Sequence, residues 1–234
     1  MSNFTWRYPA SAIAGKHRFT ADDILLLRKH MFPMGLISAD DAEQLLALHR
    51  CPSEKCGEWD NWFIETMAAY IVVHCYPQSS LDELNAEWLI ALLAQDGMVR
   101  SAAELELVLH AMEMASAVPD ILSCFALGQL QLALQSGQGA YAQSRVVKRS
   151  GIASQDIEFV YRILRGSLFA GKMVLNAAEV SALDRIDALV RGKVNDPSWK
   201  VLMRSLSVRT PEGHATATPW LQMLAEDIAL DEAA

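Results

Sequence analysis

The chain has 234 residues, of which 52% are hydrophobic and 21% are charged, and its formal net charge is −8 at pH 7. A chain of this length and hydrophobicity can bury a large core, which argues against disorder. The negative charge disfavours nucleic acid as a partner, because phosphate binding requires a basic face. No apolar run suits a membrane span and no secretory signal pattern is present, so we expect a cytoplasmic protein that does not bind membranes.

Hydrophobic periodicity predicts an all-α protein of about ten helices. Residues 1–20 are expected to form an irregular N-terminal arm. Capping residues and Gly or Pro breaks set the limits of the elements that follow. The predicted helices cover 21–31, 39–49, 59–76, 81–95, 102–115, 121–135, 154–165, 177–190, a segment opened by Asp196 and Pro197, and a last acidic segment that ends near Leu230.

The stretch 59–76 is the most apolar of these helices. Large apolar residues such as Trp59, Phe63 and Met67 follow helical spacing, and Glu65 is the one formal charge after Asp60. A helix that is apolar all round must be covered all round, so we expect the others to pack about it. Glu65 is then a candidate buried acid with a raised pKa, fit for acid–base chemistry, unless it pairs with a cation or lies at an exposed edge.

An internal repeat is the strongest pattern in the chain. A glycine break, a capping residue and an Asp that opens a further helix recur three times in the same order. The three sets are Gly35, Ser38 and Asp60; Gly97, Ser101 and Asp120; and Gly171, Asn176 and Asp196. We therefore expect three degenerate helix–turn–helix-plus-helix repeats around the central helix. Two repeats would occupy 21–136, a linker 137–153, and the third repeat with the acidic C-terminal helix 154–234.

The segment from Asp96 to Glu104 (DGMVRSAAE) resembles the helix–turn–helix signature of TerB-like, tellurite-resistance-associated helical proteins. It also resembles the second half of a degenerate EF-hand loop. The resemblance implies a helical architecture, and it makes Asp96 and Glu104 candidates for a loop cation. The matching positions before Gly35 and Gly171 carry no acid, and calcium needs several oxygen ligands.

Two further groups of residues are candidates for binding. Zinc prefers four nitrogen or sulfur ligands, and a candidate set is His49, Cys51, Cys56, His74 and Cys75. The alternative is free thiols and a histidine at a helix end. A basic patch in this acidic chain could dock an acidic partner or the acidic C-terminal helix, or could be a solvated face. Its members are Arg145, Lys148, Arg149, Arg162, Arg165 and Lys172.

No known catalytic motif is present, so we assign no catalytic residue and no cofactor. The leading hypothesis is a protein-interaction or scaffold module, with a homo-oligomer possible. It would be favoured by an exposed apolar patch larger than about 600 Å². One alternative, implied by the TerB-like resemblance, is a stress-associated metal or small-ligand binding protein. The other is an enzyme that uses Glu65, His74 or Cys75.

Overall fold

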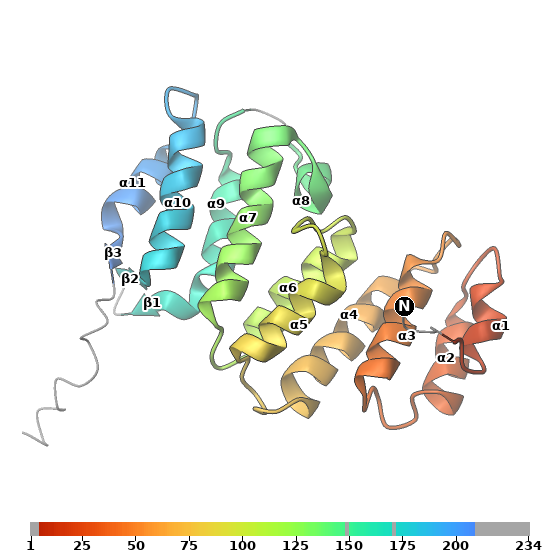
Figure 1. The fold of residues 1–234 in the computed structure, drawn as a ribbon. Coiled ribbons are helices and arrows are strands. Elements are labelled where there is room, and N and C mark those ends of the chain that lie inside the picture. The colour runs from red at the N-terminus through yellow and green to blue at the C-terminus, as the bar shows by residue number, and fades with distance from the viewer. Residues whose placement is uncertain (1–4, 148–149, 170–171, 209–234) are drawn as a thin grey trace, which may run out of the picture.

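A computed structural model describes residues 5–147, 150–169 and 172–208 of the chain (Figure 1). Within them the all-α prediction is confirmed. The α-helices are α1 (Ala10–Ala14), α2 (Ala21–His30), α3 (Ala39–Arg50), α4 (Trp59–Ala69), α5 (Glu83–Leu93), α6 (Ala102–Met114), α7 (Asp120–Ser136), α8 (Gly139–Ser144), α9 (Ser154–Ile163), α10 (Ala177–Val190) and α11 (Pro197–Ser205). A π-helix, η1 (Tyr70–His74), continues α4, and a 3-10 turn, η2 (Arg165–Ser167), follows α9. The predicted acidic C-terminal helix lies outside the described residues.

The helices follow one another along a long axis (Figure 1). The red and orange helices α1–α3 stand at one end and the blue helices α10 and α11 at the other. Helix α4 packs on α6, and α7 packs on α10, α8 and α9. One hydrophobic core runs through the array, on both sides of the glycine-rich segment before α8. Within the described residues, no helix is both long and apolar enough to cross a membrane.

A small sheet closes the end beside α10. Strand β1 (Leu168–Phe169) pairs antiparallel with β2 (Lys172–Leu175), and β2 pairs parallel with β3 (Ser207–Val208). The hydrophobic pattern predicts only helices, so it did not indicate this sheet. These strands are two to four residues long, so they do not change the fold class.

The helix starts follow from local capping chemistry. The side chains of Thr20, Ser38 and Asn176 each accept a hydrogen bond from the backbone N–H three residues later. The helices α2, α3 and α10 therefore begin where the sequence predicts. Gly97, in the turn before α6, has a φ of +80°, a conformation that favours glycine.

An acid at the third position of five helices is buried. These residues are Asp23, Asp41, Glu104, Asp156 and Glu179, each at most 4% exposed. A carboxylate at this position accepts from backbone N–H groups and favours the positive end of the helix. Four of them also bind a cation from another segment: Lys16, Arg7, Arg50 and Arg145 respectively for the first four. The pairs Arg7–Asp41 and Arg50–Glu104 tie a helix start to a distant part of the chain, and the other two tie it to the segment just before the helix.

The prediction that the central helix is covered on all sides is wrong. The face that bears Phe63 and Met67 is fully buried against the core. On the opposite side, Asn61 is exposed and the Glu65 side chain is 69% exposed. The interpretation of Glu65 as a buried acid is therefore also wrong. Its apolar sequence neighbours pack on other elements, and this side of α4 faces an open groove.

Candidate interaction groove

An open groove of about 1060 Å³ lies between α2 and α4. We call it the α2–α4 groove. It is lined by Leu25, Arg28 and Lys29 of α2, by Phe32, Pro33, Gly35 and Leu36 of the turn after it, by Asn61, Trp62, Glu65, Thr66 and Ala69 of α4, and by His74. The turn residues Phe32 and Leu36 are buried, so the floor is fixed by the hydrophobic core.

The shape of the groove follows from the two helices that form its walls. The α4 residues in the lining recur at 61, 62, 65, 66 and 69, which is one stripe about two turns long. Leu25 lies on the opposite wall and is 59% exposed. The neighbouring Ile24 and Leu27 are buried, so α2 packs on the core with one face and leaves Leu25 at the groove. The groove is therefore an apolar trough between two helices, open along its length.

The charge of the rim is mainly positive on the α2 side. Arg28 and Lys29 are exposed, and neither forms an ion pair with the part of the chain that the structure describes. Their position at the C-terminal end of α2 suits the helix dipole. On the α4 side, Glu65 Oε1 lies 3.4 Å from His110 Nε2. This nitrogen is buried and makes no hydrogen bond with any described residue, so the contact is an ion-pair distance without hydrogen-bond geometry.

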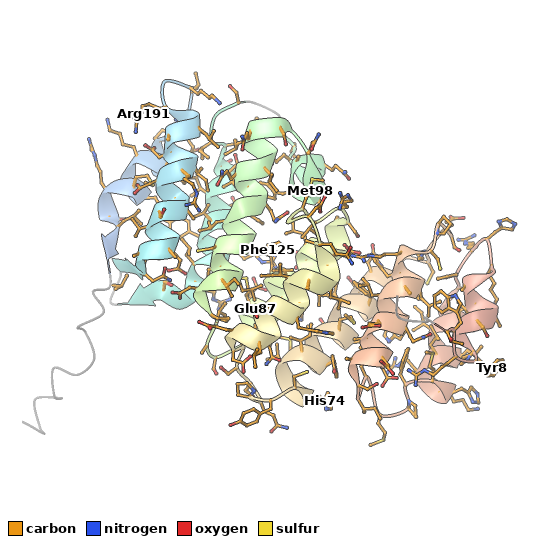
Figure 2. All side chains as sticks on the ribbon, in the orientation of Figure 1. Tyr8, His74, Glu87, Met98, Phe125 and Arg191 are labelled. Carbon is orange, nitrogen blue, oxygen red and sulfur yellow. The ribbon has the colours of Figure 1, made fainter. Side chains whose placement is uncertain are left out.

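A π-helical turn ends α4 beside the groove. The N–H of Cys75 donates to the carbonyl of Tyr70 at 3.0 Å, five residues back. The wider turn changes the direction of the following side chains, and π turns are frequent at functional sites. His74, labelled in Figure 2 at the edge of the molecule below α4, lies at the groove, and Tyr76 beyond it is 88% exposed.

His49 of the predicted zinc set packs and hydrogen-bonds within the fold. His49 stacks on Phe63 with ring centroids 4.1 Å apart. Its Nδ1 accepts from Trp59 Nε1 at 3.3 Å, and its Nε2 lies 3.1 Å from Ser101 Oγ. Burial lowers the pKa of His49, although the charges of Glu104 and Asp60 act to raise it.

The three cysteines of that set are partly buried. Burial raises the pKa of the thiols of Cys51, Cys56 and Cys75, which disfavours the thiolate that binds metal. No group of three or more metal-binding side chains comes together among the described residues. His74 and Cys75 lie at the far end of α4 from Cys51 and Cys56, so the structure separates this set into two parts.

The two residues of the predicted loop cation site bind arginines. Asp96 receives two hydrogen bonds from Arg100, at 2.5 and 3.0 Å. Glu104 is buried and accepts from Arg50 Nε at 2.7 Å, while Arg50 also donates to the carbonyl of Leu93. Both carboxylates are therefore neutralised by a guanidinium from the chain itself.

Two residues of the predicted basic patch form ion pairs within the fold. Arg145 is buried and binds both oxygens of Asp156, at 3.0 and 2.7 Å. Arg162 lies between Glu106 and Glu113, and their hydrogen bonds raise its pKa. Arg165 is exposed and borders a polar cavity of about 480 Å³ between α6, α9 and α10. Lys148 and Arg149 lie outside the described residues, and the side chain of Lys172 is not described.

The sequence pattern missed the α2–α4 groove. The signal that could have indicated it is the charge of α2, where Arg28 and Lys29 follow an exposed Leu25. Such a pattern indicates that one side of α2 is both apolar and charged. It does not show whether another helix covers that side.

No protein-family model, no curated protein and no solved structure matches this chain. The class that the fold defines is an all-α protein.

Proposed function

We propose that this chain is a protein-interaction module that receives an amphipathic helix in the α2–α4 groove. The supporting observation is the apolar trough between two helices, which Leu25 of α2 and Trp62 of α4 both line. Grooves of this kind bind helices whose apolar residues recur at every third or fourth position. The large volume and the open shape favour a helix over a small ligand, which is usually enclosed.

The interaction requires no catalytic chemistry. The wall residue Glu65 is 69% exposed on its side chain and His74 is exposed, so both side chains are open to solvent and to a docked protein surface. The groove offers apolar contact area together with two cations at its rim. These features suit the recognition of a protein surface.

Site-specific photo-crosslinking tests the proposal. A photoreactive residue is placed at Leu25 in the groove or, as a control, at Leu84 on α5, which is 74% exposed and lines none of the cavities described above. The full chain is then irradiated in its native extract. We expect adducts at position 25 that map to one apolar helix face of the partner, and no such adducts at position 84. Equal and diffuse labelling at the two positions would contradict the proposal.

A further inference from the structure

We infer that the occupant of the α2–α4 groove is the C-terminal segment 219–231 of a second copy of this chain. The inference rests on the proposed function, because it assumes that the groove binds a helix. Three observations support it: the apolar pattern of the segment, its charge, and the place where the described chain ends.

The pattern of the segment fits the groove. Its sequence, PWLQMLAEDIALD, predicts an amphipathic helix. Trp220, Leu224 and Ile228 recur every four residues and form one apolar stripe with Leu221. The stripe is about two turns long, which equals the length of the open α4 stripe from Asn61 to Ala69.

The charges are complementary. Asp227 and Asp231 are four residues apart, so on a helix they lie along one border of the apolar stripe. The groove has Arg28 and Lys29 along one edge, without an ion-pair partner among the described residues. The segment 210–234 contains no Lys or Arg. A helix that lies in the groove with this border toward α2 pairs two carboxylates with two cations.

The position of the last described strand favours a second copy over the same molecule. The strand β3 pairs with β2 beside α10, whereas the groove lies near the other end of the long axis (Figure 1). Between them α10 packs on α7, α7 on α9, α9 on α6 and α6 on α4. Four such packing distances, placed end to end, give an upper limit of roughly 32–40 Å for this separation. The ten residues from 209 to 218 reach at most about 36 Å when fully extended. Docking within one molecule therefore restricts the connector and brings it to its full reach at the larger separations, whereas docking on a neighbour sets no such limit.

A complementation experiment with full-length chains tests the inference. The groove variant carries Leu25→Glu and Lys29→Glu, and the tail variant carries Leu224→Asp and Ile228→Asp. The exposed Leu84→Glu variant is the matched control for an added surface charge. Multi-angle light scattering then measures mass against protein concentration for each variant and for mixtures.

We expect the unmodified chain and the Leu84→Glu control to exceed the one-chain mass of 25.8 kDa as concentration rises. The groove variant and the tail variant alone should each remain at one chain. Their equimolar mixture should form a complex of two chains, because the groove variant still has an intact tail and the tail variant an intact groove. Circular dichroism checks that each variant remains folded.

Other results overturn the inference in distinguishable ways. An unmodified chain that stays at 25.8 kDa at all concentrations excludes the second copy as occupant. A mixture that does not associate, although the unmodified chain does, excludes this pairing of groove and tail. If the groove crosslinks specifically to a different protein, the inference fails but the proposed function stands. If the groove crosslinks to nothing, the proposed function fails as well.

Discussion

Buried ionisable side chains hold this fold together at the contacts between distant segments. Asp156 is fully buried and accepts hydrogen bonds from Arg145, from the Tyr141 hydroxyl at 2.9 Å and from the backbone N–H of Ala153. Removing one member of such a network leaves a buried charge without a partner, which costs about 3–5 kcal/mol of stability. The other buried acids at the third position of a helix are held in the same way, by fewer hydrogen bonds. For Asp23 and Asp41, burial acts to raise the pKa, but hydrogen bonds from Lys16 and Arg7 and from cap residues lower it overall.

His49 makes stability depend on pH near neutrality. Its Nδ1 accepts from Trp59, so the folded state needs the neutral ring, and burial lowers its pKa below the usual 6.5. As pH falls through about 6.5, this histidine is protonated in the unfolded chain before it is protonated in the folded protein. The free energy of unfolding therefore falls, by at most about 1.4 kcal/mol per pH unit. We expect His49→Gln to be less stable at pH 7. Its free energy of unfolding, measured with urea, should fall less between pH 7 and 5 than that of the unmodified chain.

The matched control for this prediction is His17→Gln, because His17 is exposed. It should retain the pH slope of the unmodified chain. If His49→Gln also keeps the dependence of the unfolding free energy on pH, His49 does not cause that dependence.

At the level of the elements, local chemistry explains most of what the sequence predicted. The helices α2, α3 and α10 begin at capping residues whose bonds involve only three or four neighbouring residues, so their starts follow from the sequence. The short helix α8 begins at Gly139, a poor helix former, and is held by contacts with α7 and α6. Such contacts join residues that are distant in the chain, and no local pattern contains them.

The candidate site could not be predicted for the same reason. The sequence shows that α4 is apolar on most of its surface, but it does not show which side a neighbour covers. In the α2–α4 groove, the turn that bears Phe32 and Leu36 forms the floor, while Glu65 on the α4 wall remains exposed. The sequence also does not show which charged residues are buried. Arg145 of the predicted basic patch binds a buried carboxylate in a helix eleven residues away.

The turn before α6 is fixed by one side chain of α7. Gln129 is 3% exposed, and its Oε1 accepts from the N–H of Val99 while its Nε2 donates to the carbonyl of Gly97, both at 3.0 Å. We expect Gln129→Ala to lower the unfolding free energy by about 1–3 kcal/mol, because it leaves the buried N–H of Val99 without its partner. Hydrogen exchange at the Val99 amide should accelerate at the same time.

The exposed Gln135 of the same helix provides the control. Gln135→Ala should change stability by no more than about 0.5 kcal/mol and leave exchange at Val99 unaltered. Equal effects of the two substitutions would show that helix propensity, and not the tie to the turn, is responsible.

At the scale of the whole molecule, the proposed contact joins two different surfaces. One copy supplies the α2–α4 groove near one end of the array, and the other supplies a segment that follows β3 at the opposite end (Figure 1). Such a heterologous contact leaves a free groove and a free tail on every open complex, so the complex either closes into a ring of two or more chains or continues to grow. A mass above that of one chain that rises with concentration is therefore expected of the unmodified chain.

Reversing the charges of the groove rim and of the tail tests whether the two surfaces meet. Arg28→Glu with Lys29→Glu should abolish association, and so should Asp227→Lys with Asp231→Lys, because each places like charges across the contact. All four substitutions in one chain should restore it, since the pairs are then exchanged. Arg191→Glu with Lys193→Glu, an exposed pair near the other end, should have no effect. Because the rim is exposed, association of the unmodified chain should also weaken as salt shortens the screening length to about 10 Å at 0.1 M. Failure of the fourfold variant to associate, measured by light scattering beside both double variants, would show that the basic rim does not face the acidic border of the tail.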